Sequence, residues 1–306
     1  MKLKDSYHPY AITTIVLWSC AYVLSRLALQ YFSAYTLGFL RYVIATIVML
    51  AVVIITKMKR PALRDVKWFL AAGASGFALY MITFNTGQAT LNSSTSSVVI
   101  ALAPVVTSVL ARFIFHERLH LIQWLSIAVS FAGVVILTLL SGGLKLNIGI
   151  LWLLAAVVLL SFFNILQRKL TKIYTALQTS AFSIFAGTLL LSVFLPTSVT
   201  QVMKAPGIQL VYIGILGVGS SAIAYCAWAT AFAKAEKTSS VSNYMFVTPF
   251  LASVLGVIIG GETINLPTVI GGLIILSGLL LFHMGARHHK RQTDTEKSGI
   301  NSQSVR

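Results

Sequence analysis

Charge is scarce in this chain of 306 residues, because Asp, Glu, Lys and Arg together make up 10% of it, against about 25% in an average soluble domain. Only 7 residues are acidic, whereas 57% are hydrophobic. A soluble core cannot bury that much apolar surface, but a bilayer can, since a spanning helix needs about 20 mostly apolar residues. The alternation of polar and apolar residues that marks a membrane β-barrel is missing. The composition therefore predicts an all-α integral membrane protein.

Several kinds of reactive group are also missing. The two cysteines, Cys20 and Cys226, lie in hydrophobic segments, so a disulfide framework is not implied. No Asp, Glu or His stands near the middle of a predicted span, which disfavours antiport through a buried carboxylate and leaves Ser220 and Ser221 without a base for hydrolysis. Metal-ligand clusters, phosphate loops and nucleotide motifs are absent, so we expect no enzyme activity, no cofactor and no metal.

Hydropathy predicts ten transmembrane helices. They lie at 9–29, 36–56, 67–87, 93–114, 121–140, 148–168, 175–195, 208–230, 239–260 and 265–285. The first five form one repeat over 9–140 and the last five form a second repeat over 148–285. Residues 1–8 form a short N-terminus, and the polar, basic segment 286–306 is expected to be a disordered tail.

The net charge of +16 invites a nucleic-acid interpretation, but the positions of the basic residues argue against it. The loops that share a side with both termini hold 19 of the 23 lysines and arginines, and the opposite loops hold only Lys145 and Lys204. Cytoplasmic loops carry such an excess. We therefore expect cytoplasmic termini in a bacterial plasma membrane and no nucleic-acid partner.

Part of the hydrophobic sequence is repeated within the chain. The stretch from Ser94 to Leu121 recurs 145 residues later, from Ser239 to Leu266, with nine identities in 28 positions and no gap. Because each copy holds an odd number of spans, the second copy enters the membrane from the opposite side. The sequence thus predicts two inverted five-helix repeats, an arrangement that many transporters use to build a site that can face either side.

Polar and aromatic side chains recur at matching depths in the first, third, sixth and eighth spans. Such groups are costly in lipid, so we expect them to face the protein interior or a water-filled cavity. Asn164, at mid-span, leaves two interpretations open, an interhelical hydrogen bond or a contact with the substrate. The candidate cavity-lining residues are Trp18, Tyr22, Tyr80, Thr83, Asn164, Tyr225 and Trp228.

The fourth and ninth spans open with runs of small hydroxyl residues, and each contains a proline. Tight packing with a kink and a bend at a central cavity are both compatible with this pattern, because small residues allow close approach and a proline removes a helical hydrogen bond. The candidates on these spans are Ser97, Asn243 and Tyr244 for substrate binding, and Pro104 and Pro249 for the bends.

Four charged residues lie near the ends of spans. Arg26 and Arg41 stand in outer halves, where either could extend to the surface, or one could meet a carboxylate on a substrate. Glu117 and Glu262 precede the fifth and tenth spans, near helix N-termini, where negative charge is favoured. We predict gate or structural roles for Arg41, Glu117 and Glu262, with Glu117 inside and Glu262 outside.

Two five-span halves, a proline 13 residues before a Glu in each, and the run from Phe39 to Tyr42 resemble the EamA family of the drug/metabolite transporter (DMT) superfamily. The resemblance covers about residues 9–285. It departs at the seventh span, where Ser183 stands in place of a second Arg41. The resemblance implies an exporter or carrier of amino acids or other small metabolites.

We therefore predict a secondary transporter that moves a small organic metabolite, with export favoured, by alternating access. An amino acid or another amphipathic compound suits the aromatic candidates. The expected partners are this substrate and the lipid bilayer. The alternatives are a non-transporting sensor or assembly component, a channel and an intramembrane enzyme.

Overall fold

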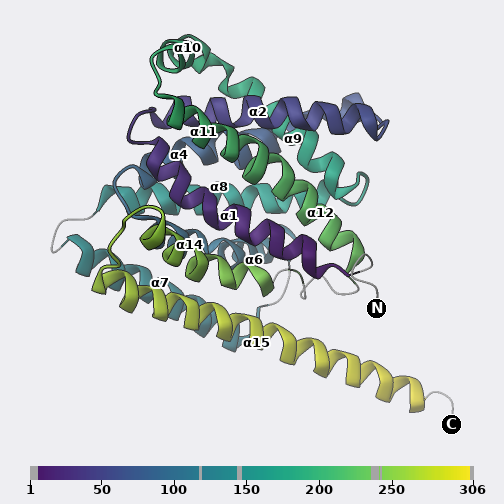
Figure 1. The fold of residues 1–306 in the computed structure, drawn as a ribbon. Coiled ribbons are helices and arrows are strands. Elements are labelled where there is room, and N and C mark those ends of the chain that lie inside the picture. Colours follow the sequence, from purple (N-terminus) through teal and green to yellow (C-terminus); the bar gives the residue numbers. More distant parts are fainter. Residues whose placement is uncertain (1–5, 117–118, 143–146, 236–240, 242, 304–306) are drawn as a thin grey trace.

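The computed structural model describes residues 6–116, 119–142, 147–235, 241 and 243–303, and every regular element in these ranges is a helix (Figure 1). Two short elements, η3 and η5, are π-helical, and η2, η4 and η6 are 3₁₀ turns. The elements are α1 His8–Ala28, α2 Ala34–Ile55, η2 Leu63–Asp65, α3 Val66–Gly73, η3 Ala74–Ala78, α4 Leu79–Gln88, α5 Ser93–Ile100, α6 Ala103–Ile114, α7 Leu121–Gly142, α8 Ile148–Leu170, α9 Ala176–Leu191, η4 Ser192–Phe194, α10 Leu195–Met203, α11 Gly207–Ile215, η5 Leu216–Ile223, α12 Ala224–Lys234, η6 Asn243–Phe246, α14 Val247–Ile258 and α15 Leu266–Gln303.

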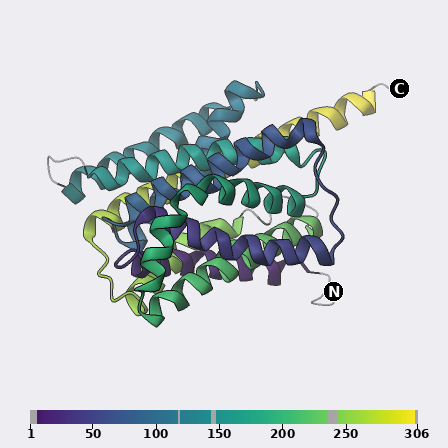
Figure 2. The ribbon, with the colours of Figure 1, turned by 90° about the horizontal axis from the view of Figure 1, so that it is seen from above.

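Seven helices or continuous helical stretches in the described ranges are long and apolar enough to cross a membrane, and three shorter apolar helices accompany them. The shorter ones are Leu121–Leu137, Tyr244–Ile258 and Leu266–Phe282. The prediction of an all-α membrane protein is confirmed. α15 continues to Gln303 and projects past the other helices (Figure 2); the disorder predicted for the tail stays a prediction.

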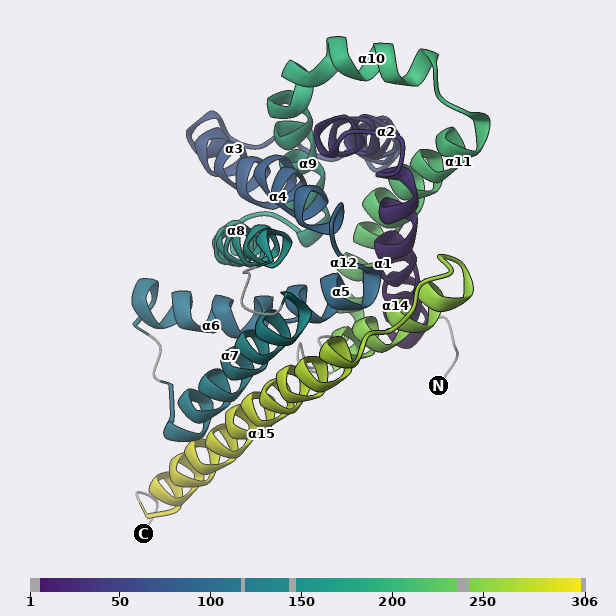
Figure 3. The same ribbon diagram turned by 90° about the vertical axis from the view of Figure 1, so that its left-hand side faces the viewer.

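The two repeats meet through equivalent positions. A Cβ added to Gly133 of α7 would lie 2.7 Å from Ile275 of α15, and one added to Gly278 of α15 would crowd Ser130 of α7. Gly133 and Gly278 are 145 residues apart, as are Ser130 and Ile275. The two contacts therefore exchange under a pseudo-two-fold rotation, and α7 and α15 pack antiparallel along one side of the bundle (Figure 3).

The same relationship links α2 and α9. Thr46 Oγ1 lies 2.7 Å from Thr188 Oγ1, and the two threonines are 142 residues apart, which is the offset that relates the first spans of each repeat. Thr188 also donates to the carbonyl of Tyr42 at 3.1 Å. Interhelical hydrogen bonds of this kind hold membrane helices together in the absence of a hydrophobic driving force.

Two π-helical segments interrupt the third and eighth spans at matching positions. η3 precedes α4, which carries Tyr80, and η5 precedes α12, which carries Tyr225. A π-turn removes the regular hydrogen-bond ladder and occurs frequently at functional sites. Each π-helical segment rotates the side chains that follow it about the helix axis. The equivalent residues Tyr80 and Tyr225 are therefore rotated in the same sense.

The two prolines stand near the starts of helices that follow a break. α5 ends at Ile100, and Pro104 lies in the first turn of α6. Pro249 is the third residue of α14, which follows the 3₁₀ turn η6. Pro104 is exposed whereas Pro249 is buried, so the copies give the two prolines different surroundings.

Side-chain caps fix several helix starts. Asn92 accepts from Thr95 N at 2.8 Å, and Asn147 accepts from Gly149 N at 3.0 Å, which satisfies backbone donors that a helix start leaves free. The predicted span 175–195 ends earlier than the helical stretch, which continues through α10 to Met203. Gln201 ties this extension to the α1–α2 connection, because its Oε1 accepts from Ser33 N at 3.1 Å.

Candidate functional site

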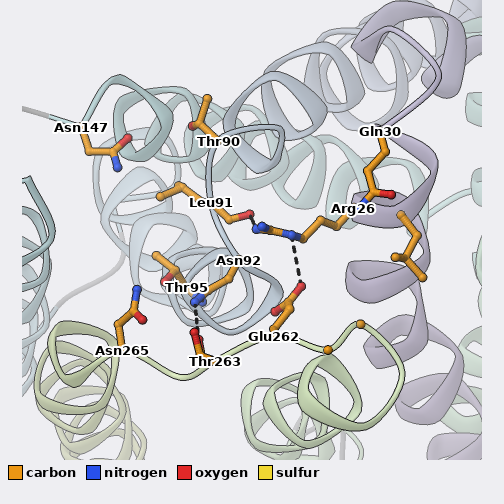
Figure 4. Close-up of a pocket in the computed structure, with 13 residues that line it drawn as sticks. Arg26, Gln30, Thr90, Leu91, Asn92, Thr95, Asn147, Glu262, Thr263 and Asn265 are labelled. Carbon is orange, nitrogen blue, oxygen red and sulfur yellow. Dashed lines mark hydrogen bonds and ion pairs between the residues drawn. The ribbon is translucent and has the colours of Figure 1, made fainter.

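A polar pocket lies at the end of the bundle opposite the two termini (Figures 1 and 4). It encloses about 470 Å³ between the end of α1, the α4–α5 connection, the start of α8 and the α14–α15 connection. Its lining brings amide, hydroxyl and charged groups together. The lining residues are Arg26, Leu27, Gln30, Thr90, Leu91, Asn92, Thr95, Asn147, Gly260, Gly261, Glu262, Thr263 and Asn265.

An ion pair crosses this pocket. Arg26 Nε lies 3.3 Å from Glu262 Oε1, and the Arg26 guanidinium also donates to the carbonyl of Leu91 (Figure 4). The Glu262 carboxylate accepts from Ser93 N at 2.8 Å and from Ser93 Oγ at 2.7 Å. Glu262 thus joins α1 and the start of α5, and its position at a helix N-terminus stabilises the negative charge.

An aromatic group lies between α1 and α12. The ring centroid of Trp18 is 5.6 Å from that of Tyr225 and 5.3 Å from that of Trp228. Trp18 Nε1 donates to the carbonyl of Ser220 in η5 at 3.2 Å. The structure therefore brings three of the predicted cavity-lining residues together, and all three are half-buried.

A second aromatic group adjoins it. Tyr22 packs edge-on against Phe84 with the centroids 5.6 Å apart, and Tyr80 stacks on the same Phe84 at 5.6 Å. Phe77 extends the first group towards α2, since its ring lies 5.5 Å from Tyr225 and 5.2 Å from Tyr42. Tyr80 and Tyr225 pack against the main core and yet keep accessible surface. That combination is expected of side chains that line a space between helices.

Arg41 lies among these tyrosines. Its side chain does not extend to the outer surface, which was one interpretation of its position, because it is only 5% exposed. Arg41 Nε donates to Ser221 Oγ at 2.5 Å, and its guanidinium carbon is 5.9 Å from the centre of the Tyr42 ring. Arg26, by contrast, remains about one-third exposed and has a carboxylate partner.

Other predicted residues lie away from this group or bond elsewhere. Thr83 donates to the carbonyls of Leu79 and Tyr80, and Ser97 to that of Ser94, each within its own helix. Asn164 Nδ2 donates to Thr107 Oγ1 at 3.1 Å, the interhelical bond that was one of its two interpretations. Tyr244 bonds His8 Nδ1 at 2.5 Å near the N-terminus. The Asn243 side chain and Glu117 lie outside the described residues.

Some site residues were not among the sequence candidates. The sequence places Ser221 on the same face of the eighth span as Tyr225 and gives it no base for hydrolysis, and Tyr42 belongs to the run that resembles the EamA family. The polar residues of the pocket carried one usable signal, which is that Asn92 and Asn147 directly precede predicted spans, where asparagine caps helices. Within the described residues, no three His, Cys, Asp or Glu side chains gather closely enough to hold a metal ion.

Comparison with known proteins identifies the family. Residues 6–139 and 147–284 both match the EamA-like transporter family, so the match covers most of the chain in two copies. The chain belongs to the EamA-like transporter family. Proteins of this EamA type are two-repeat membrane proteins of the DMT superfamily, as the sequence resemblance implied.

Relatives of this EamA protein carry transporter names. It is 28% identical to the transporter YdfC of Bacillus subtilis (strain 168), with 88% of each chain covered. It is 26% identical to a probable terminal-alkyne amino-acid exporter of Streptantibioticus cattleyicolor, with 93% of this chain and 95% of that one covered. A crystal structure with 19% identity and a TM-score of 0.62 covers 92% of this chain and 98% of its own, and it shares the fold. The EamA protein is a membrane transporter.

Proposed function

We propose that this EamA protein is a secondary transporter that exports a small amphipathic metabolite by alternating access. The observation that carries the proposal is the ion pair between Arg26 of the first repeat and Glu262 of the second, which joins the two repeats at one end of the bundle. In this proposal the pair keeps that end closed. The aromatic groups around Trp18, Tyr22, Tyr80 and Tyr225 lie deeper along the same helices.

The closed end faces the outside of the cell in this proposal. Both termini and the strongly basic connections lie at the opposite end of the bundle (Figure 1), and an excess of lysine and arginine marks the cytoplasmic side of bacterial membrane proteins. The present conformation is then closed to the outside. Breaking the Arg26–Glu262 pair while the two repeats rock against each other would open the pocket outward.

The substrate would lie near the aromatic groups. The side chains of Trp18, Tyr225 and Trp228 each combine an apolar ring with a polar N–H or hydroxyl group. This combination suits a molecule with an apolar part and a polar part. A relative of similar length is named as a probable exporter of an amino acid, which supports this class of substrate.

Transport by the reconstituted protein tests the proposal. Proteoliposomes that contain the full chain would be loaded with mixtures of amino acids and other small metabolites, and efflux would be followed by mass spectrometry against empty liposomes. We expect selective loss of a small set of amphipathic compounds. Equal retention of every compound in both kinds of liposome would contradict a transport function, and steady single-channel current would indicate a channel instead.

A further inference from the structure

Arg41 is a buried cation on α2. It is the eighth residue of α2 and is 5% exposed. A charge in such a position is costly unless a partner of opposite charge compensates it, and intramembrane ionisable residues are therefore rare and generally functional. We therefore expect Arg41 to have either an anionic partner in the protein or a function in binding an anion, which would offset the free-energy cost of burying its charge.

Every described partner of the Arg41 side chain is neutral. Nε donates to Ser221 Oγ at 2.5 Å, and Nη1 lies 3.9 Å from the thioether sulfur of Met81. Within the residues that the structure describes, ion pairs join Arg26 to Glu262 and Arg64 to Asp65, and neither includes Arg41. The guanidinium thus holds its charge without a carboxylate from the described chain.

The surrounding backbone fixes the place of Arg41. A Cβ at Gly217 of η5 would meet Ile44 at 2.6 Å and the carbonyl of Arg41 at 3.0 Å, so α2 approaches η5 closely at this point. On the other side of α2, a Cβ at Gly38 would lie 3.2 Å from Met81. Two glycines thus hold α2 between η5 and the α4 helix, with Arg41 aimed at Ser221 and Met81.

Aromatic rings from neighbouring helices lie beside the guanidinium. The Arg41 guanidinium carbon is 5.9 Å from the centre of the Tyr42 ring, and the Phe77 ring packs against both Tyr42 and Tyr225. These rings provide apolar surface together with hydroxyl groups. The repeat offers no second cation here, because Ser183 takes the equivalent position in α9. Among the described residues, Arg41 is thus the charged group of this site, and aromatic surface lies beside it.

We propose that Arg41 binds the carboxylate of the transported molecule, and that the tyrosines with Trp18 take its aromatic or aliphatic part. This inference rests on the proposed transport function and narrows its substrate to small amphipathic carboxylates. A guanidinium matches a carboxylate in two parallel hydrogen bonds. One arginine without a neighbouring lysine suits a monoanion better than a phosphate dianion. The described residues around Arg41 provide no carboxylate for an amino group, so an amino group is not required.

Binding of matched probes to the purified full chain tests this assignment. The probes are 3-phenylpropionate, L-phenylalanine, L-phenylalaninamide, 2-phenylethylamine and phenyl phosphate, and thermal shift with isothermal titration reports binding. We expect both carboxylates to bind at least ten-fold more tightly than the amide, the amine and the phosphate. Tighter binding of any of these three than of the carboxylates, or no binding of either carboxylate, would overturn the inference.

Variants separate a binding role from a structural role. Arg41→Gln should weaken carboxylate binding at least ten-fold, while Arg41→Lys should retain part of it because it keeps the positive charge. The ligand-free Arg41→Gln protein should unfold at the same or a higher temperature, since an uncompensated buried charge is removed. Arg64→Gln, which removes an exposed arginine outside the candidate site, is the matched control and should bind the carboxylates like the wild type. Unchanged carboxylate binding in Arg41→Gln would contradict the assignment.

The outcomes also separate this inference from the transport proposal. Carboxylate binding that depends on Arg41, without efflux from proteoliposomes, would support the site and contradict transport. Efflux of neutral or cationic compounds that is unchanged in Arg41→Gln would support transport and contradict the site.

Discussion

The hydroxyl oxygens of Thr46 and Thr188 lie 2.7 Å apart at positions that the two repeats share. A residue can contact its own repeat equivalent only where the pseudo-two-fold axis passes between them. The contacts Gly133–Ile275 and Ser130–Gly278 exchange with each other when the repeats are exchanged, so a pseudo-two-fold axis also passes between α7 and α15. The two repeats therefore meet at α2–α9 and at α7–α15, on surfaces that both contribute equally.

The threonine pair should couple the repeats energetically. Thr46→Val and Thr188→Val should each destabilise the protein, and the double variant should lose less than the sum, with a coupling of about 0.6 kcal/mol, as is typical of interhelical hydrogen bonds in membranes. Unfolding in detergent measures the cycle. Thr200→Val is the control, because that hydroxyl bonds only the carbonyl of Pro196 in its own helix. Strict additivity would show that the two hydroxyls do not interact.

Close packing of α7 on α15 should depend on glycine. A Cβ at Gly133 would lie 2.7 Å from Ile275 and 3.0 Å from the carbonyl of Gly271, so Gly133→Leu must push the helices apart at a cost of about 1–3 kcal/mol. A lower midpoint of thermal unfolding is the expected result. Gly214→Ala is the matched control, since a Cβ there would meet nothing within 4 Å. Equal stability of Gly133→Leu and the wild type would contradict the antiparallel contact.

Transport should depend on the aromatic residues beside α1. Tyr225→Ala and Trp228→Ala should reduce efflux several-fold without loss of folded protein, because each removes part of the surface next to Trp18. Trp152→Ala removes an equally large ring from an exposed position on α8 and should leave efflux unchanged. If Tyr225→Ala and Trp228→Ala both transport like the wild type, the aromatic groups do not form the site.

Asn164 should behave as a structural residue first. Its amide donates to Thr107 between α8 and α6, so Asn164→Ala should lower stability by about 0.6 kcal/mol, the average for such bonds, and by no more than about 1.7 kcal/mol. Thr107→Val should cost a similar amount and add little to Asn164→Ala. Reduced efflux at unchanged stability would instead favour the contact with substrate that the sequence also allowed.

The sequence predicts the architecture because lipid enforces it. Spans must be apolar over their whole length, and basic residues must stay on one side, so the helices and the repeat can be recognised from the order of residues alone. The Arg26–Glu262 pair could not be recognised in this way, because its members are more than two hundred residues apart and meet only when the repeats pack.

The π-helical segments η3 and η5 could not be predicted from the sequence either. Nothing in the residues from Ala74 to Ala78 or from Leu216 to Ile223 distinguishes a π-turn from an α-turn, because tertiary packing decides between them. Those turns place Ser221 against Arg41, which is why the buried partner of that arginine was not predicted. The candidate tyrosines were predicted from depth alone, since polar groups at such depth must face the interior.

Accessibility of Tyr225 from the two sides of the membrane tests alternating access most directly. In a protein with Cys20→Ser, Cys226→Ser and Tyr225→Cys, an impermeant thiol reagent would be added to right-side-out and to inside-out vesicles. With the Arg26–Glu262 pair intact, we predict reaction mainly from the cytoplasmic side. Adding Arg26→Gln should raise reaction from outside and lower it from inside, whereas Arg64→Gln, which removes an exposed arginine, should change neither. Equal reaction from both sides in every variant, or reaction from neither, would contradict alternating access.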